Sequence, residues 1–386
     1  MRGIFGSNAT VFATLIAIAA AGAATASHGV AQTTASAIAN WPQFKSDNFH
    51  TGYNAVEKTL TVGNVPNLVV KWSDAAGSNG MSTSPAVANG IVYFGASNET
   101  FYAVDAKTGA PKWHASTDGA ILSSAAVVNG IVYVGSEDDY LYAFNAETGK
   151  ALWSVPTGDS IENSSPVVAN GIVYVGSDDA GLYAFNATTG KKVWTTFVSD
   201  AITSSPAVKG NIVYVGSVDG GLHAFNAKTG ARLWTGRTGN QVTSSPAIAG
   251  NVVYVGSLDQ GLYAFNAVTG AKVWKAVLGG SVESSPSLFN GVVYVAADDG
   301  NVYALDAKTG KQRWHRLVGN FVDSSPAVAN GVVYIGSDNG AFYALNATTG
   351  AILFKRLVTS QFDSSPAVAN GVVYIGASRL FAFGLK

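Results

Sequence analysis

The sequence predicts an all-β fold: an eight-bladed β-propeller with four antiparallel strands per blade, closed by pairing an N-terminal strand with the C-terminal blade. Three observations support this prediction: an internal repeat, four strand-like runs in each repeat, and chain ends that complement each other. The repeat comes first, because a fixed period decides the architecture of a chain. A Ser-Ser-Pro-like tripeptide recurs every 40 or 41 residues and ends at Pro85, Ala125, Pro166, Pro206, Pro246, Pro286, Pro326 and Pro366.

Each repeat contains four short runs of β-branched and aromatic residues, as in SSPAVANG, VVYVGS, LYAFNA and KVWKAV. Such runs predict strands. The Asn-Gly, Asp-Gly and Thr-Gly pairs between them predict tight turns, because Gly adopts positive φ and Asn or Asp bonds the turn backbone. The second run is apolar at nearly every position, which predicts a strand covered on both faces. It is centred on a tyrosine in every repeat: Tyr93, Tyr133, Tyr174, Tyr214, Tyr254, Tyr294, Tyr334 and Tyr374.

The two ends of the chain predict a closed ring rather than an open stack. A fourth-strand run, Leu68 to Ser73, precedes the first complete repeat, whereas the last repeat stops after its third run, Leu380 to Phe383. Pairing these segments would complete the eighth blade and bury two sheet edges. The propeller is therefore expected to span residues 67–386 as one domain, with the first strands lining its axis. For the N-terminal arm, residues 32–66, two places stay open: over one channel mouth or along the side.

Residues 1–31 have the layout of a secretory signal peptide, with one charge near the start, an apolar run from Val11 to Ala21 and then small residues. Cleavage is expected after Ala26 or Ala31. The mature chain would then be extracytoplasmic, either periplasmic or secreted. The alternative is an N-terminal membrane anchor, but the apolar run is shorter than the ~20 residues that span a bilayer. No later segment is predicted to be transmembrane, because glycine or polar residues interrupt every apolar stretch.

The composition excludes several classes of protein. Charged residues make up 12% of the chain, about half the usual ~25%, and 44 of 386 residues are Gly, so long polar helices and disordered tails are disfavoured. The net charge of −1, without long runs of like charge, predicts no nucleic-acid partner and no attraction to anionic lipid. The absence of Cys excludes disulfides, thiolate metal sites, catalytic thiols and an N-terminal lipid anchor on cysteine.

The junction between the third and fourth runs carries the motif Ala-x-Asp/Asn-Ala-x-Thr-Gly-x-x-x-Trp, as in AVDAKTGAPKW at 103–113, AFNAETGKALW at 143–153 and ALDAKTGKQRW at 304–314. It resembles the tryptophan-docking motif of the pyrroloquinoline quinone (PQQ) repeat family. That family includes eight-bladed quinoprotein alcohol dehydrogenases and non-catalytic relatives such as the outer-membrane assembly lipoprotein BamB. WD repeats have a similar period, but their Gly-His and Trp-Asp signatures are missing here.

The resemblance covers essentially the whole mature chain, and the lead-in WPQFKSDNFHTGYN at 41–54 is similar to the segment before the first strand of those enzymes. It implies that one aromatic side chain per blade lies between adjacent blades, over the glycine of a neighbouring turn. Burial of the large apolar area of such a ring would stabilise the contact between the two blades. The residues at this position are Trp72, Trp113, Trp153, Trp194, Trp234, Trp274, Trp314 and Phe354.

The resemblance does not carry the catalytic apparatus with it. The dehydrogenases hold the quinone over the channel mouth with residues from long insertions: Ca²⁺ ligands, a base Asp, a stacking Trp and commonly a vicinal Cys pair. Here the repeat intervals never exceed 41 residues and the chain has no Cys. We therefore expect no catalytic residues, no PQQ and no Ca²⁺. The alternative is a minimal quinoprotein dehydrogenase that uses PQQ and Ca²⁺.

The position three residues before the Pro of each repeat departs most from the symmetry. Around the ring it holds Ser82, Leu122, Asn163, Thr203, Thr243, Glu283, Asp323 and Asp363. Three carboxylates thus fall in consecutive blades. If the first strands line the axis, Glu283, Asp323 and Asp363 form an acidic arc at one channel mouth, a candidate site for Ca²⁺ or a cationic group. The alternative is a hydrated polar rim without an ion, because an intact Ca²⁺ site needs roughly 6 to 8 oxygens.

The remaining polar residues are expected to be structural. Serine pairs such as Ser204 and Ser205 recur in nearly every blade, whereas a catalytic serine would be singular, so their hydroxyls should satisfy backbone groups or channel water. Acidic residues in the turns after the second strands fit turn chemistry. His223 replaces a repeated Tyr and should be packed or hydrogen-bonded. No metal spacing relates the five histidines, His28, His50, His114, His223 and His315.

The sequence therefore predicts a monomeric, non-catalytic, extracytoplasmic propeller that acts as a binding or scaffold module, with a protein or glycan partner on one of its faces. The regularity of the ring is the reason, because an active site normally breaks such symmetry with insertions. Two alternatives stay open: the minimal quinoprotein dehydrogenase, and a carbohydrate- or cell-envelope-binding protein. The lysines and arginines of the fourth runs protect edge strands, or else bind an acidic partner.

Overall fold

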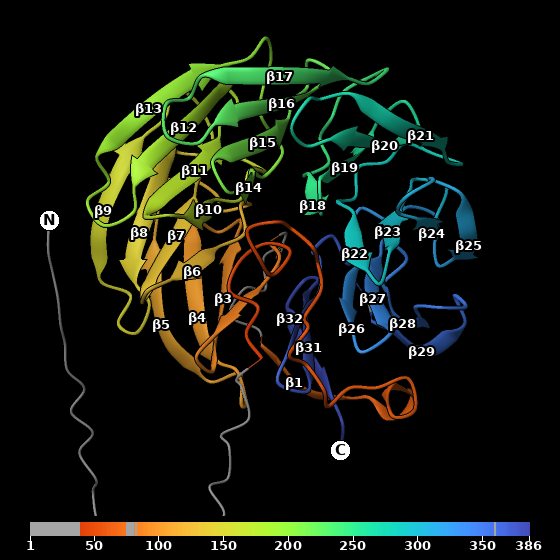
Figure 1. Cartoon of the computed structure of the whole chain (residues 1–386). Helices are drawn as coiled ribbons and strands as arrows, with labels where there is room; N and C mark the ends of the chain where they lie inside the picture. The colour runs from red at the N-terminus through yellow and green to blue at the C-terminus, as the bar shows by residue number, and fades with distance from the viewer. Residues whose placement is uncertain (1–38, 75–80, 82, 359) are drawn as a thin grey trace, which may run out of the picture. The chain divides into compact units, whose positions relative to one another are not determined.

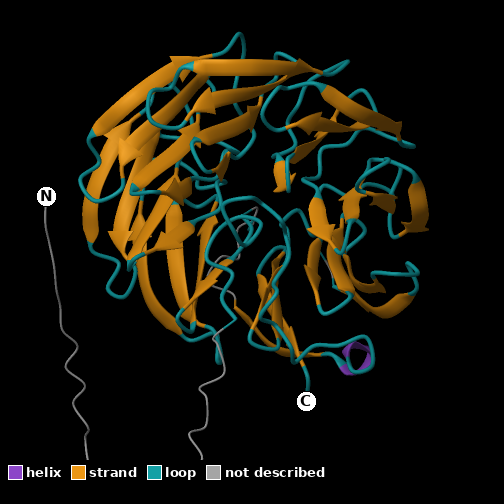
Figure 2. Cartoon of the chain, viewed as in Figure 1, coloured by secondary structure: helices purple, strands orange, loops and turns teal. Residues whose placement is uncertain are grey.

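The computed structural model describes residues 39–74, 81, 83–358 and 360–386. In this part of the chain the strands form eight four-stranded antiparallel sheets, and the helical content is a single 3-10 turn, η1 (Val65–Asn67) (Figure 2). The predicted all-β, eight-bladed fold is confirmed. The predicted signal peptide, with its cleavage points after Ala26 and Ala31, lies outside the described residues. Within them, no helix has the length and apolar character needed to cross a bilayer.

The four strands of a blade run from the axis of the ring to its rim (Figure 1). The innermost strands have three residues each: β2 (Ala86–Ala88), β6 (Ala126–Val128), β10 (Val167–Ala169), β14 (Ala207–Lys209), β18 (Ala247–Ala249), β22 (Ser287–Phe289), β26 (Ala327–Ala329) and β30 (Ala367–Ala369). The second strands are β3 (Ile91–Ala96), β7 (Ile131–Gly135), β11 (Ile172–Gly176), β15 (Ile212–Gly216), β19 (Val252–Ser257), β23 (Val292–Ala296), β27 (Val332–Ser337) and β31 (Val372–Gly376).

The third strands are β4 (Thr100–Asp105), β8 (Tyr140–Asn145), β12 (Gly181–Asn186), β16 (Gly221–Asn226), β20 (Gly261–Asn266), β24 (Asn301–Asp306), β28 (Ala341–Asn346) and β32 (Leu380–Gly384). The outermost strands are β5 (Pro111–Ser116), β9 (Ala151–Pro156), β13 (Lys192–Phe197), β17 (Arg232–Arg237), β21 (Lys272–Val277), β25 (Gln312–Leu317), β29 (Ile352–Leu357) and, in the eighth blade, β1 (Val69–Asp74). We number the blades 1 to 8 by their innermost strands, β2 to β30.

The ring closes as the sequence predicts. Strand β1 pairs antiparallel with β32, so that Trp72 lies opposite Ala382 and Asp74 opposite Leu380. Each innermost strand also contacts the innermost strands of both neighbouring blades, including β2 with β30. The N-terminal strand therefore supplies the outer edge of blade 8.

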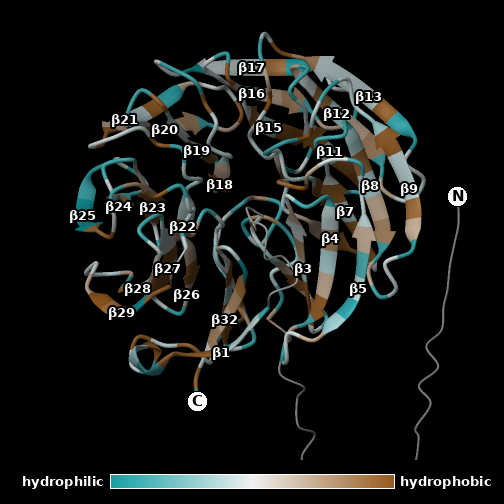
Figure 3. Cartoon of the chain, turned by 180° about the vertical axis from the view of Figure 1, so that it is seen from behind, coloured by the Kyte–Doolittle hydropathy of each residue, from teal (hydrophilic) through white to brown (hydrophobic). Residues whose placement is uncertain are grey.

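The core lies between the sheets. The second strands are almost entirely buried, and β27 is buried along its whole length. Hydrophobic residues fill the strands between axis and rim, while hydrophilic residues gather in the connecting turns (Figure 3). The apolar second runs of the sequence are thus covered on both faces, as predicted.

The propeller has two faces with different loops. We call arm face the one that carries the turns after the innermost and third strands, which are joined by bonds such as Ala106 N–H to Gly90 O at 2.9 Å. We call cavity face the one that carries the turns after the second strands and the connections between blades. Glu137 N–H to Ala120 O, at 2.9 Å, joins loops of this face.

Candidate functional site

Residues 41–52 of the N-terminal arm lie inside the ring of innermost strands (Figure 1). Its Trp41 exchanges two backbone hydrogen bonds with Val87 of β2, at 2.8 and 2.7 Å. Further along, carbonyls of the arm accept backbone N–H groups from the innermost strands of blades 2, 4, 5, 6 and 7: Pro42 from Val127, Asn48 from Val208, Phe49 from Ile248, Thr51 from Leu288 and Gly52 from Val328. The arm enters and leaves by one face, since Ala39 bonds Asn370 and Glu57 bonds Gly371. Of the two places left open by the sequence, the first is closer to the structure: residues 41–52 close this channel mouth from within, and the arm then extends outward to η1, which contacts β29.

A compact turn of the arm fills the channel with Phe44, Lys45 and His50. The Lys45 side chain is 2% exposed, and its Nζ donates to Ser287 Oγ and Pro326 O, both at 2.6 Å. Burial lowers the pKa of Lys45 well below its usual range. Burial and the neighbouring Lys45 lower the pKa of His50 to about 3, so His50 is neutral at physiological pH.

A ring of serines surrounds the axis beside this turn. In each blade the backbone N–H of one serine donates to the hydroxyl of the corresponding serine in the next blade, from Ser84 to Ser124 at 2.9 Å and finally from Ser365 back to Ser84 at 3.0 Å. The preceding residue of the pair accepts a bond within its own blade, as in Gly135 N–H to Ser123 Oγ at 2.9 Å, and Ser164 also donates to Ser204 O of the next blade at 3.0 Å. The structural role predicted for the serine pairs is confirmed. The ring comprises Ser84, Ser124, Ser165, Ser205, Ser245, Ser285, Ser325 and Ser365.

The serine ring and Phe44 enclose a small cavity of about 150 Å³ that opens toward the cavity face. Each ring hydroxyl accepts one N–H, and among the described residues none of the eight has an acceptor for its own proton. The hydroxyls of Thr203 and Thr243 in the same lining are buried without a partner in the described part of the chain. The cavity therefore offers hydroxyl donors to whatever enters it.

The predicted acidic arc lies at the mouth of this cavity. Glu283, Asp323 and Asp363 occupy equivalent exposed positions in blades 6, 7 and 8, and the last two line the cavity. Partial desolvation, then repulsion from Asp338, Glu283, Asp298 and Asp363, raises the pKa of Asp323 to about 6. Desolvation also raises the pKa of Glu283 and of Asp363. A cation at this rim would relieve the repulsion.

The arc does not converge into a ligand set. Among the described residues, no group of three or more His, Asp or Glu side chains is placed to hold a metal ion. Glu283, Asp323 and Asp363 as a metal site thus stay a prediction. The lining does not fit PQQ either: the quinone carries three carboxylates, whereas the cavity presents Asp323 and Asp363 and no lysine or arginine. An anionic cofactor there would meet like charge.

The docking aromatics lie where the family resemblance implies. Trp194 covers Gly230 of the next blade so closely that a Cβ on Gly230 would be 2.8 Å from the indole. Its Nε1 donates to Ala227 O at 3.0 Å, and the hydroxyl of Tyr174 donates to the same carbonyl at 3.0 Å. The other tryptophans repeat this contact. Phe354 contacts Phe342 and Phe383 by ring edges instead.

His223 and acidic turn residues such as Asp259 are structural, as predicted, whereas Asp338 has a buried Oδ1 without a partner in the described part of the chain. Asp259 accepts the backbone N–H of Gly261 at 3.0 Å and the Tyr263 hydroxyl. His223 takes the place of that Tyr in blade 4: its Nε2 lies 3.0 Å from Asp219 Oδ1, and its Nδ1 lies 3.0 Å from Thr235 Oγ1. A reaction that used the carboxylates of Asp259 or Asp219 would first have to break these hydrogen bonds.

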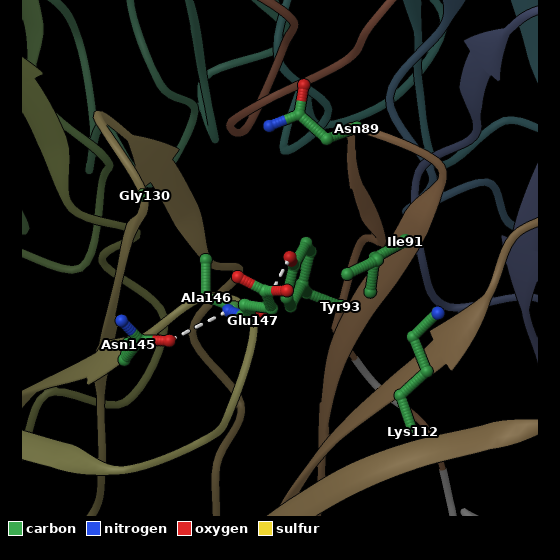
Figure 4. A pocket seen from close by; sticks show the side chains of 8 residues that line it. All are labelled: Asn89, Ile91, Tyr93, Lys112, Gly130, Asn145, Ala146 and Glu147. Atoms are coloured by element: carbon green, nitrogen blue, oxygen red, sulfur yellow. Dashed lines mark hydrogen bonds between the residues drawn. The ribbon is translucent and has the colours of Figure 1, made fainter.

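A groove of about 660 Å³ opens on the arm face between blades 1 and 2 (Figure 4). Its floor is the interblade contact, with the Tyr93 hydroxyl bonded to Ala146 O at 3.0 Å, and Lys112 and Glu147 stand on its walls. Similar grooves of about 400 and 490 Å³ lie between blades 8 and 1 and between blades 5 and 6. These grooves are products of the repeat, and no pair of nucleophile and base lines them.

Comparison with solved structures agrees with the architecture. BamB from Moraxella catarrhalis superimposes with a TM-score of 0.73 at 18% identity, over 82% of this chain and 100% of that one. Quinohemoprotein alcohol dehydrogenase from Comamonas testosteroni gives 0.79 at 17%, over 90% and 80%. A europium-containing methanol dehydrogenase gives 0.76 at 14%, over 90% and 98%. At these identities the likeness shows the fold alone.

No curated protein matches the chain in sequence. The family model described as outer membrane protein assembly factor BamB does match, in four segments at residues 69–165, 157–245, 237–321 and 318–380. These segments cover most of the chain and follow the repeats that make up the blades. With the eight blades, the docking tryptophans and this match, the chain belongs to the PQQ-like repeat β-propeller family of BamB.

Proposed function

We propose that this protein is a non-catalytic binding or scaffold module whose cavity face receives a partner. The observation that carries the proposal is the position of the arm. Because residues 41–52 occupy the channel and bond the innermost strands, the axis offers only a blind cavity of about 150 Å³. Reaction sites usually need a deeper enclosure and convergent acid–base groups.

The carboxylates at the mouth of the cavity indicate what kind of partner would bind there. Asp323 and Asp363 are held near other carboxylates at partly desolvated positions, and a positively charged group would lower the free energy of their ionised forms. The serine hydroxyls below can orient around a polar group that enters the cavity. A cationic segment of a protein partner fits this combination best, and a neutral glycan fits it less well because it would leave the rim charges unpaired.

An extracytoplasmic location is part of the proposal. It is supported by the signal-like segment of residues 1–31 and by membership in a family described by an outer-membrane assembly factor.

Two assays test the proposal. In the first, the purified protein is supplied with PQQ and CaCl₂, and dye reduction is followed with alcohols and sugars; we expect no turnover above the protein-free control. Substrate-dependent turnover that is lost in Asp323→Ala would overturn the proposal in favour of a quinoprotein dehydrogenase.

In the second assay, calorimetry measures binding of a lysine-rich peptide and of a neutral oligosaccharide. We expect the peptide to bind and the double variant Asp323→Asn, Asp363→Asn to weaken it. The matched control is Asp200→Asn, an exposed carboxylate on the same face away from the axis. Equal weakening by the control, or binding of the oligosaccharide alone, would contradict a cation-specific mouth.

A further inference from the structure

The net charge of −1 conceals a strong separation of charge between the two faces. On the arm face, the turns after the third strands carry exposed lysines in five blades: Lys107, Lys150, Lys191, Lys228, Lys308 and Lys311. The adjoining starts of the outermost strands add the exposed side chains of Lys112, Lys192, Arg232, Lys272 and Arg313. These cations follow the ring around most of its circumference.

Few carboxylates offset them on this face. In the turns after the third strands, the acidic residues are Asp105, Glu147 and Asp306. Asp306 pairs with Arg313 at 2.7 Å, and Asp105 lies 3.8 Å from Lys112. The other lysines of the arm face make no ion pair within the described residues, so the face as a whole is positive.

The cavity face has the opposite sign. Most of the chain's 24 Asp and Glu residues lie in its loops, among them Asp298 and Asp338 beside the acidic arc and Glu137 and Asp178 in blades 2 and 3. Burial and neighbouring carboxylates raise the pKa of Asp178 to about 6, which reflects how densely this charge is packed. Arg379 is the cation of those loops in the described part of the chain, and from the outermost strands Arg237 pairs with Asp219 and Lys275 with Asp259, so most of these carboxylates stay unpaired. The disc is therefore positive on one side and negative on the other.

A second, independent observation concerns the N-terminal end of the described chain. Ala39 N–H donates to Asn370 Oδ1 at 2.9 Å, and Asn40 Oδ1 accepts the N–H of Asn89 at 3.3 Å. Asn370 and Asn89 belong to turns of the arm face. The described polypeptide thus enters the propeller through the positive face.

We propose that the arm face docks on an anionic phospholipid bilayer and that the cavity face points away from it. Phosphate headgroups attract a lysine-rich surface within about a Debye length of ~10 Å, and they repel the carboxylates of the opposite face. Only one orientation of the disc is then favourable. This proposal differs from the expectation drawn from the net charge, because a net charge does not record how charged residues are distributed over the two faces. This proposal goes beyond the binding function and does not depend on it.

Cosedimentation with vesicles tests the docking. The chain from residue 32 keeps every described residue and lacks the apolar leader, so binding reports the folded propeller. We expect it to sediment with phosphatidylglycerol-containing vesicles, not with pure phosphatidylcholine vesicles, and to be released by salt. The variant Lys107→Glu, Lys150→Glu, Lys228→Glu should lose at least about tenfold in partitioning. The matched control Lys355→Glu, Arg356→Glu, Arg379→Glu changes the net charge equally but lies outside the arm face, and it should keep most of the binding.

Orientation is read separately with single cysteines, because the chain has none of its own. An environment-sensitive fluorophore on Thr188→Cys, an exposed position of the arm face, should respond to anionic vesicles. The same label on Ser199→Cys, exposed on the cavity face, should not. Equal partitioning to neutral and anionic vesicles, equal loss in the two triple variants, or a response from Ser199→Cys alone would overturn the proposal. Binding to a heparin column without binding to anionic vesicles would also overturn it, in favour of a polyanionic polymer.

Discussion

Tyr294 and Tyr334 occupy the same position in neighbouring blades, yet only Tyr294 has a hydrogen-bond partner for its hydroxyl. Tyr294 donates to Ala347 O at 3.0 Å, whereas the buried Tyr334 hydroxyl is unpartnered within the described residues. The residue of blade 8 that corresponds to Ala347 is Leu385, and Leu385 O accepts Lys71 Nζ instead. The seam between blades 7 and 8 also carries Phe354 in place of a tryptophan. It is therefore the least polar of the interblade contacts.

Removing the two hydroxyls should have different effects on stability. Tyr294→Phe loses one hydrogen bond to a buried carbonyl, so its free energy of unfolding should fall by about 1 kcal/mol. Tyr334→Phe removes a buried hydroxyl without a partner, so it should be neutral or slightly stabilising. Urea denaturation of both variants measures the difference. A larger loss for Tyr334→Phe than for Tyr294→Phe would show that Tyr334 is bonded.

The docking of tryptophan on glycine should appear as a steric effect separate from backbone strain. Gly230 and Gly210 both have positive φ, at 70° and 60°, but only a Cβ on Gly230 would meet an indole, that of Trp194. Gly210→Ala should cost about 1–2 kcal/mol from the left-handed conformation alone. Gly230→Ala should cost more, because the Trp194 ring must also move. Equal losses would mean that the indole adjusts freely.

Glu57 should anchor the arm to blade 8. Its side chain is 1% exposed, Oε1 accepts the N–H groups of Thr59 and Leu60, and Oε2 accepts Gly371 N–H at 2.7 Å. Glu57→Ala should lower the free energy of unfolding by about 1.5–3 kcal/mol, since three backbone N–H groups, two of them in buried hydrogen bonds, lose their acceptor. The matched control is Glu147→Ala, an exposed turn position, which should change stability by less than about 0.5 kcal/mol.

His223 should make stability depend on pH. Burial lowers the pKa of His223 despite its bond to Asp219, so the folded state stays neutral where the unfolded state takes up a proton. The free energy of unfolding should therefore decrease as pH falls below about 6.5, the ordinary His pKa. His223→Tyr, which introduces the residue found at this position in six of the other seven blades, should reduce this decrease, as thermal unfolding across pH 5 to 8 would measure. An unchanged pH profile would assign the dependence to other groups.

The repeat determines most of what the sequence could predict. Blade number, closure through Trp72 and the docking aromatics follow from a pattern repeated eight times. Where one repeat is ambiguous, the other repeats show which residues form its strands. The Ser-Ser-Pro runs extend beyond the strands they predict, because their serines bond across blades instead of along them.

The course of the arm could not be predicted in the same way. The segment 41–52 occurs only once in the sequence and has no repeat to compare it with. Its hydrogen bonds use backbone carbonyls, which every residue type has, so the sequence does not reveal them. The burial of Lys45 and His50 could not be expected from the sequence, because lysine is almost never fully buried in proteins. The charge separation was missed for a related reason: a net charge ignores which turns share a face.

Hydrogen exchange of the innermost strands tests most directly whether the arm fills the channel. The amides of Val127, Val208, Ile248 and Leu288 donate to the arm and should exchange slowly. Val168, the equivalent residue of blade 3, has no such bond among the described residues and should exchange fast. Slow exchange at the four bonded positions with fast exchange at Val168 is the predicted result. Fast exchange at all five would mean that the channel is open, and it would contradict the blind cavity on which the proposed binding function rests.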